Sequence, residues 1–102
     1  MRTFFCRLNP PRPSFAMDMS PEEAALMQRH AEHWREAMGR GEVVAFGLVG
    51  DPRGPFGIGI LQVEDEAAAH AFTGADPVIV ADRGFRYDVL PMPFGVVHPG
   101  AA

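Results

Sequence analysis

The chain has 102 residues, of which 47% are hydrophobic and 22% charged, so its composition fits one folded domain spanning residues 1–102 and excludes a disordered chain. Nine basic and thirteen acidic residues give a formal net charge of −4 without a basic cluster, which excludes nucleic acid as an expected partner. No apolar run approaches the roughly 20 residues that cross a bilayer, and the single Cys6 excludes an internal disulfide, so we expect a soluble cytoplasmic protein with no membrane partner.

Residues 2–8 are predicted to form the first strand, because the character of the side chains alternates along them. Phe4, Cys6 and Leu8 fall on one side. We interpret Cys6 as a small hydrophobic residue of the sheet, because nothing beside it in the sequence would lower the pKa of a catalytic thiol. The prolines that follow end the strand, since proline cannot donate to a ladder.

The segment 9–19 is predicted to be a loop of about ten residues, a length at which connections often bind ligands or act as lids. Phe15, Met17 and Met19 make it unusually apolar for a connection. Two interpretations stay open: the segment is a binding loop, or its side chains cover the edge of the sheet.

A helix is predicted from residue 20 to residue 41, and both of its ends are marked in the sequence. Ser20 is a good N-cap, Pro21 fits the first helical position, and Glu23 stands where it completes a capping box. Gly41 or Gly39 can take the left-handed backbone that ends a helix.

One side of this helix is apolar. At about 100° per residue, its inward face is predicted to consist of Met27, Ala31, Trp34 and Met38. His30 lies at the edge of this stripe. A titratable imidazole there has two interpretations, a structural histidine with a hydrogen-bond partner or a functional group.

Residues 42–50 and 56–63 are predicted to form a hairpin around a turn at 51–55, which is rich in proline and glycine. Gly57 and Gly59 fall on the same face of the second strand. Because neither carries a side chain, this face leaves room for a helix, a ligand or a second subunit to come close.

The C-terminal half begins with a short helix predicted over residues 64–72. Asp76 and Pro77 then open a turn, and a further helical turn follows at 78–81. The last strand is predicted over 85–92. Arg86 and Tyr87 point to opposite sides of it, so only one of them can line a pocket on a given face.

The resulting order β-α-β-β-α-β is the ferredoxin-like arrangement of the α+β class. It predicts a four-stranded antiparallel sheet with both helices on one face. The other face carries hydrophobic side chains that nothing in this chain covers, and an apolar surface of that size predicts association. We therefore expect a homodimer that packs sheet on sheet through this open face.

Short motifs are distributed over nearly the whole chain, in a specific order and spacing. They are Pro10-Pro11-Arg12-Pro13, Met27-Gln28-Arg29-His30 with Trp34 a turn later, Gly41 before Val43-Val44 and Gly47, the hairpin from Gly54 to Gly59, Ala75-Asp76-Pro77, and Phe85 to Met92. By these motifs the chain resembles the YCII family, small proteins of the dimeric α+β barrel type. It departs from the family pattern at Leu48, where many members have proline, and at Asp82, where glycine is common.

The resemblance implies a His/Asp pair in a pocket between sheet and helix, here His30 and Asp76. One relative is a dehydrochlorinase acting on a chlorinated hydroxyquinol, which implies a lyase-like or aromatic-handling role. Most members of the family are uncharacterised.

The chemistry of such a pair is that of a general base. A carboxylate beside an imidazole fixes its tautomer and raises its basicity, so His30 would accept a phenolic or enolic proton while Asp76 orients it. Phe15, Met27 and Trp34 are the predicted substrate-binding wall. The competing interpretation is that Asp76 only caps the turn that contains Pro77.

These observations leave three hypotheses for the function. The first is a small cofactor-independent enzyme, lyase-like or isomerase-like, acting on a small aromatic or enolisable substrate. The second is a non-catalytic small-molecule-binding or accessory dimer, and the third is a dimeric scaffold with a structural histidine. We expect no metal site, because His30 and His33 lack an obvious third ligand, and we interpret His33 and His70 as solvated surface residues.

Overall fold

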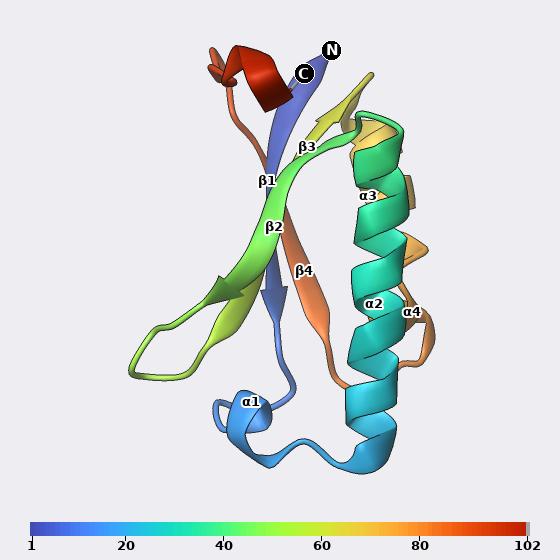
Figure 1. Cartoon of the computed structure of the whole chain (residues 1–102), viewed down its shortest axis with the longest axis vertical. Helices are drawn as coiled ribbons and strands as arrows, with labels where there is room; N and C mark the ends of the chain where they lie inside the picture. Colours follow the sequence, from blue (N-terminus) through green and yellow to red (C-terminus); the bar gives the residue numbers. More distant parts are fainter. Residues whose placement is uncertain (102) are drawn as a thin grey trace.

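The molecule is organised around a sheet of four antiparallel strands in the order β2-β3-β1-β4. The computed structural model describes residues 1–101, and its strands are β1 (Arg2–Asn9), β2 (Val43–Val49), β3 (Phe56–Val63) and β4 (Arg86–Pro91). The two longer helices, α2 (Pro21–Gly39) and α3 (Glu66–Gly74), lie on one face of the sheet (Figure 1). The predicted α+β class and ferredoxin-like order are confirmed.

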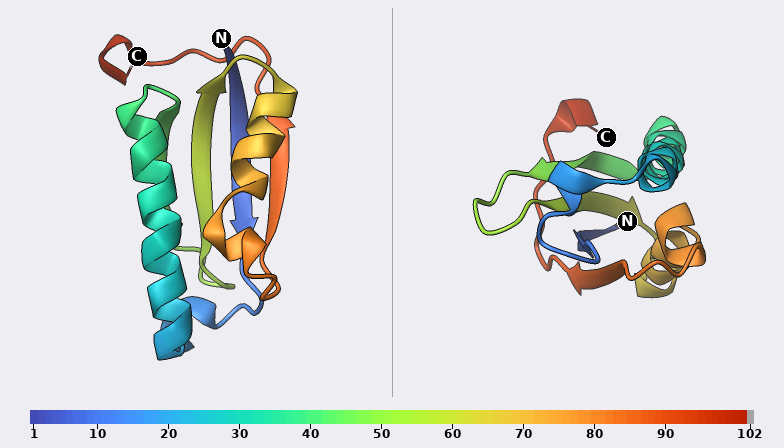
Figure 2. Two further views of the ribbon diagram at one scale, coloured as in Figure 1. Left: turned by 90° about the vertical axis from the view of Figure 1, so that its right-hand side faces the viewer. Right: turned by 90° about the horizontal axis from the view of Figure 1, so that it is seen from below.

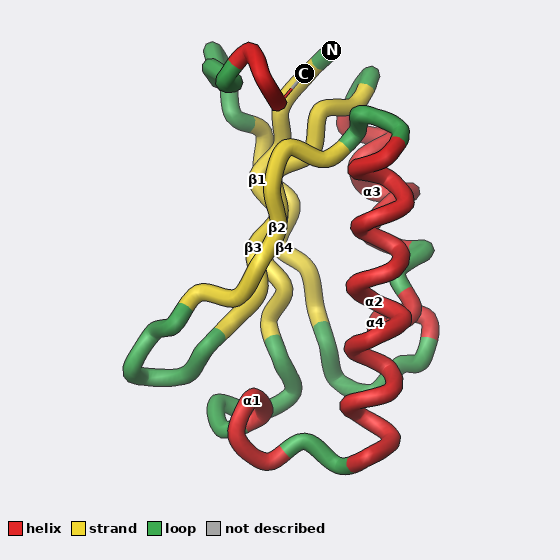
Figure 3. Tube along the Cα trace, viewed as in Figure 1, coloured by secondary structure: helices red, strands yellow, loops and turns green. Residues whose placement is uncertain are grey.

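Three short helices complete the fold: α1 (Phe15–Asp18), α4 (Pro77–Val80) and the 3₁₀ turn η1 (Pro99–Ala101). Figure 3 shows α1 in the connection from β1 to α2, so the prediction of a loop throughout residues 9–19 was wrong. A single turn has no apolar period that a sequence pattern could reveal. No helix in the described part of the chain combines the length and the apolarity that crossing a membrane requires.

The central strand is β1, and its alternation is confirmed. Cys6 pairs with Gly59 of β3 on one side and with Val89 of β4 on the other. Phe4, Cys6 and Leu8 are buried under the helices. Because Tyr87 of β4 is paired with Leu8, its side chain falls on the same helix-covered face.

Helix α2 begins as predicted, but its inward face was only partly predicted. The Ser20–Glu23 capping box is present. Trp34 is buried, whereas Met38 is 39% exposed, which corrects the predicted face. The other buried residues of α2 are instead Leu26 and Ala37. The reason is that α4 packs beside α2 and Phe72 of α3 contacts its flank at His33 and Trp34, so the buried face of α2 is turned toward them (Figure 2).

Two groups of buried side chains lie between the helices and the sheet. The group that we call the upper core, near the N-terminal end of β1, consists of Phe4, Cys6, Trp34, Ala37, Val43, Leu61, Val63 and Ala69. The group that we call the lower core, near the other end of β1, consists of Leu8, Phe15, Leu26, Val78 and Phe85. Trp34 belongs to the upper core and faces the lower one.

The second face of the sheet has no helix over it among residues 1–101 (Figure 1). Strand register places Phe5 beside Ile60 on β3 and beside Leu90 on β4. Ile58 precedes Ile60 by two residues on β3 and lies on the same open face. Phe5 and Ile60 come from the two central strands, and Leu90, which is 55% exposed, comes from the edge strand β4, so the open face is apolar.

Candidate functional site

A hollow of about 330 Å³ lies beneath α2, between the lower core, strands β2 and β3, and α1. We call it the apolar hollow, because apolar residues form almost all of its wall. Its lining includes Phe15, Ala16, Met19, Met27, Ala31, Trp34, Phe46, Leu48, Phe56 and Phe85. Only two lining residues carry a titratable side chain, His30 and Tyr87.

The space is present because several positions around it carry small side chains. Gly57 of β3, paired with Leu8, lines the hollow from the helix-covered face of the sheet, and Ala31 lines it from α2. Two residues further along β3, Gly59 is covered by the ring of Trp34, since a Cβ built at Gly59 would lie 2.3 Å from the indole. The glycines on the inner face of β3 therefore serve two purposes, a seat for a ring and an open space.

His30 and Asp76 meet at the wall of this hollow. His30 projects from the middle of α2, and Asp76 is the N-cap of α4, where it accepts from the backbone N–H of Val78. The two side chains are joined by a hydrogen bond of 2.7 Å between Nδ1 of His30 and Oδ2 of Asp76. His30 and Asp76 are 46 residues apart in the sequence. The long helix α2 and the N-terminus of the short helix α4 thus bring an imidazole and a carboxylate together.

Asp76 is completely buried, and its carboxylate accepts four hydrogen bonds. Besides His30 and the Val78 amide, its donors are Nε1–H of Trp34 at 3.0 Å and the hydroxyl of Tyr87 at 2.5 Å. Burial acts to raise the pKa of this carboxyl, but the hydrogen bonds and charge of His30, and then the other donors, outweigh burial and hold the pKa below its usual value. Asp76 is therefore ionised at neutral pH.

Tyr87 is a member of this cluster that sequence reasoning did not identify. Its hydroxyl donates to Asp76 and accepts from Nε1–H of Trp34 at 2.9 Å. Burial, and then the neighbouring carboxylate, raise the pKa of the phenol, so Tyr87 keeps its proton and stays a donor. Alternation along the last strand placed Arg86 and Tyr87 on opposite sides, but it decided neither which of them faces the pocket nor the partner that it meets there.

The arrangement fixes the tautomer of His30. An ionised carboxylate accepts a proton and cannot donate one, so Nδ1 of His30 carries the hydrogen in this bond. In the neutral form of the ring, Nε2 holds a free lone pair, and no residue among 1–101 is hydrogen-bonded to this nitrogen. The hollow thus presents one basic nitrogen in an apolar wall, with a buried anion behind it that would stabilise the imidazolium.

The three residues predicted to form a substrate-binding wall, Phe15, Met27 and Trp34, all line the apolar hollow. Phe15 comes from α1 and is buried, with its ring edge-on to Phe85 at a centroid distance of 5.0 Å. Met19 also lines the hollow, whereas Met17 points to solvent with 77% of its surface exposed. The segment 9–19 therefore closes one end of the hollow as well as covering the sheet.

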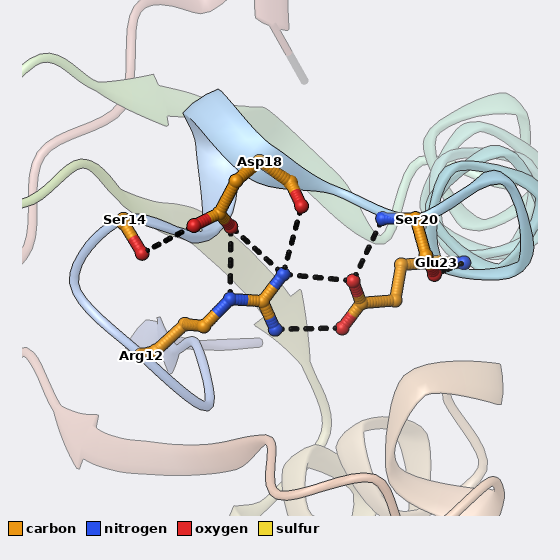
Figure 4. A network of polar contacts seen from close by, with 5 residues as sticks. All are labelled: Arg12, Ser14, Asp18, Ser20 and Glu23. Carbon is orange, nitrogen blue, oxygen red and sulfur yellow. Dashed lines mark hydrogen bonds and ion pairs between the residues drawn. The ribbon is translucent and has the colours of Figure 1, made fainter.

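A polar network holds α1 in this position (Figure 4). Nε of Arg12 donates to Asp18 at 2.8 Å, and its two terminal nitrogens donate to the two oxygens of Glu23 at 2.9 and 2.8 Å. Glu23 also accepts from the backbone N–H of Ser20 at 2.9 Å. The bonds from Arg12, and then that from Ser20, lower the pKa of Glu23 to about 2, so the network is ionised at physiological pH.

The other candidate residues lie outside the hollow. His33 is half-buried, bonded through Nε2 to the carbonyl of Phe72 at 2.8 Å and stacked on its ring, so its interpretation as a solvated residue was wrong. His70 is exposed. Burial raises the pKa of the Cys6 thiol to about 12, which makes it unreactive. Among residues 1–101, no three His, Cys, Asp or Glu side chains gather in a group that could hold a metal ion.

Comparison with known proteins agrees with the fold and the motifs. The model of the YCII-related domain matches residues 3–93, which include every strand except the first residue of β1, all the helices that line the hollow, and both His30 and Asp76. A search of curated proteins gives no match. On this match over most of its length, the chain belongs to the YCII-related domain family.

Proposed function

We propose that the protein is a small cofactor-independent enzyme in which His30 acts as a general base and acid, oriented by Asp76. The observation that carries this proposal is the 2.7 Å bond between the two side chains at the wall of an apolar hollow. A buried carboxylate with four donors is costly to assemble, and such clusters concentrate at functional sites. A structural role alone would not require the second nitrogen of His30 to remain unbonded.

The reaction begins with a proton transfer. Nε2 of His30 takes a proton from a phenolic or enolic hydroxyl, or from a carbon next to a carbonyl, and the substrate becomes an enolate-type anion. Asp76 stabilises the imidazolium by accepting its Nδ1–H. In an isomerisation, the imidazolium returns the proton to another atom of the substrate. In an elimination, the anion expels a leaving group, and the imidazolium gives its proton to that group or to water.

The hollow favours a small, flat and largely neutral substrate. A volume of about 330 Å³ and walls of Phe15, Trp34 and Phe46 suit one aromatic ring or an acyl group of similar size. Exclusion of water from such walls strengthens the attraction between the imidazolium and the developing anion. The substrate class that we infer is therefore a small aromatic or enolisable molecule.

The experiment that tests this proposal measures proton exchange. Purified protein is incubated in D₂O with a hydroxyquinol and with a cyclic 1,3-diketone, and deuterium incorporation is followed by NMR. We expect His30→Gln to lower the exchange rate about a hundredfold or more, because general base catalysis contributes that much. His70→Gln, at an exposed histidine of α3, is the matched control and should retain the parental rate. A His30→Gln variant as active as the parent would refute the role of His30.

The alternative is a non-catalytic module that binds a small molecule in the same hollow. It is favoured by the scarcity of polar groups in the wall, since only His30 and Tyr87 can contact a ligand with a titratable group. This alternative predicts a saturable thermal shift with the same hydroxyquinol, equal exchange rates with and without protein, and recovery of the ligand unchanged.

We further propose that the chain forms a homodimer through the open face of the sheet. The apolar residues Phe5, Ile60 and Leu90 support this, because a contiguous apolar surface is costly to leave in water. Leu90→Glu should convert the dimer to a monomer in sedimentation velocity experiments. Val80→Glu, at a residue that is 70% exposed on the helix side, is the matched control and should leave the dimer intact.

A further inference from the structure

Four arginines line a second hollow at the end of the sheet. This hollow, which we call the arginine groove, has a volume of about 660 Å³ and lies between the connection after β1 and the turn of the β2–β3 hairpin. All nine basic residues of the chain are arginines, and four of them gather here in a protein of net charge −4: Arg7, Arg12, Arg53 and Arg86. Asp51 is the only carboxylate among the residues that line the groove.

Two of the four guanidinium groups are already neutralised. Arg12 is bound to Asp18 and Glu23, and Arg53 is paired with Asp51 at 3.1 Å. The other two, Arg7 and Arg86, form no ion pair within residues 1–101. The groove therefore contains two guanidinium groups whose positive charge has no carboxylate partner.

The guanidinium of Arg7 is held in one orientation. It lies 3.7 Å from the centre of the Phe56 ring, and its Nε donates to Oδ1 of Asn9 at 3.0 Å. These contacts use the face of the group and one of its edges, and no described residue bonds to its two terminal nitrogens. Because the side chain is already ordered, a ligand that meets these nitrogens loses little further entropy on binding.

Asn9 connects the two unpaired arginines. It is the last residue of β1 and lies opposite Arg86 of β4. Its amide nitrogen donates to the backbone carbonyl of Arg86 at 3.3 Å and to Asp88 at 2.9 Å. Asp88 faces Arg7 across the strands, and Asp51 also feels the charge of Arg7, so two carboxylates border the site. This local balance of charge suits one small anion and disfavours a polyanion.

We propose that the arginine groove binds the oxyanion of a small molecule, a carboxylate or a phosphate, through the guanidinium groups of Arg7 and Arg86. The planar fork of arginine matches both of these anions in geometry. The groove shares Pro10, Pro55 and Phe56 with the wall of the apolar hollow, so the anion lies beside that hollow and outside it. The site stands on its own observations and does not depend on the proposed function.

The test is calorimetric titration of the full chain with inorganic phosphate and, separately, with malonate, at an ionic strength held constant with sodium chloride. We expect saturable binding of at least one of the two, and the stronger one identifies the anion class. Arg7→Gln and Arg86→Gln should each weaken binding about tenfold or more, because each removes charge-assisted hydrogen bonds to the anion. Arg35→Gln, at an exposed arginine of α2, is the matched control and should bind like the parent.

Two further variants distinguish the possible outcomes. Arg86→Lys keeps the charge without the fork and should bind more weakly than the parent but better than Arg86→Gln. His30→Gln should bind the anion normally, so that a failure of the proposed catalysis would leave this result unaffected. The absence of saturable binding by either anion would overturn the proposal, as would an equal loss in Arg35→Gln.

Discussion

The upper core and the lower core lie under the same helix and on the same face of the sheet, yet only one of them is hollow. In the upper core, Trp34 packs edge-on against Phe72 at a centroid distance of 4.8 Å and lies directly on Gly59. In the lower core, Gly57 lies on the same face of β3 with no ring on it, and the apolar hollow opens there.

The backbone is alike in the two cores, and the difference lies in the size of the side chains between helix and sheet. The candidate site is therefore open where these side chains are small. Trp34 forms the boundary, since its ring belongs to the upper core while its Nε1–H reaches Asp76 and Tyr87. Close packing above therefore fixes the polar cluster below, and a change on one side of the boundary should be felt on the other.

The largest effect is expected when the polar cluster at this boundary loses its acceptor. Asp76→Ala leaves the three side-chain donors His30, Trp34 and Tyr87 without their common partner and removes the cap of α4. We expect a loss of about 3–5 kcal/mol in the free energy of unfolding, measured by urea denaturation. Asp76→Asn keeps the shape and the cap, so it should cost less.

The same carboxylate gives a pH dependence. Because its pKa is lower in the folded protein than in the unfolded chain, its contribution to stability is complete above the ordinary value of 3.8 and is lost as the pH falls through the folded value. In Asp76→Asn this part of the acid sensitivity should disappear. In the urea experiment, a loss of less than about 1 kcal/mol in the free energy of unfolding of Asp76→Ala would mean that this carboxylate does not hold the cluster together.

The next effect comes from the seat of the indole ring. In Gly59→Ala the new Cβ would lie 2.3 Å from the buried ring of Trp34, so the ring must shift out of its packed position, and we expect a loss of about 1–3 kcal/mol in the same measurement. Gly57→Ala is the matched control in the lower core. The nearest atom to a Cβ at that glycine is Cβ of Leu8, at 3.3 Å, so a smaller loss than in Gly59→Ala is expected. Equal losses in the two variants would show that both ends are packed alike.

How far the sequence predicts this molecule depends on whether the cause is local. The capping box at Ser20 and the alternation of β1 follow from neighbouring residues, and both are present as predicted. The inward face of α2 was predicted wrongly at Met38, because its direction is set by α3 and α4, which lie far along the chain. Asp82 has a left-handed φ of 53°, a conformation that glycine adopts most easily, and this agrees with the family resemblance, which implied glycine at this position.

The candidate site divides in the same way. The pairing of His30 with Asp76 was indicated only through the family resemblance, since neither helical period nor turn chemistry connects residues 46 apart. The third partner, Tyr87, was not predicted, because alternation assigns a face and not a contact. The network of Arg12 was missed for a further reason: its partners are brought together by the single turn of α1, which has no signature of its own.

A smaller effect should distinguish the cores at alkaline pH. The pKa of the Cys6 thiol is raised from 9.0 to about 12 in the folded protein, so between these values the unfolded chain loses a proton that the folded chain keeps. Stability should therefore fall as the pH rises from 9 toward 12, and Cys6→Ala should remove the part of this loss that begins near pH 9. Identical alkaline unfolding profiles for parent and variant would contradict the burial of this thiol in the upper core.

The smallest effect is expected at the closed end of the hollow, where the lower core depends on an exposed network. Arg12→Gln removes the bonds to Asp18 and Glu23 that hold α1 against the start of α2, and with it the fixed position of Phe15. Because exposed ion pairs contribute little to global stability, the urea midpoint should barely change. Local opening should increase, so amide hydrogen exchange at Phe15–Asp18 should become several-fold faster while β1 keeps its protection.

The matched control for this change is Arg40→Gln, which breaks an exposed pair with Glu42 at the far end of α2 and should leave exchange in α1 unaltered. If Arg12→Gln also left α1 unaltered, burial of Phe15 against Phe85 would be sufficient to hold the segment. The end of the hollow would then be closed by the same apolar packing that fills the upper core, and the contrast between the two cores would rest on their glycines and alanines alone.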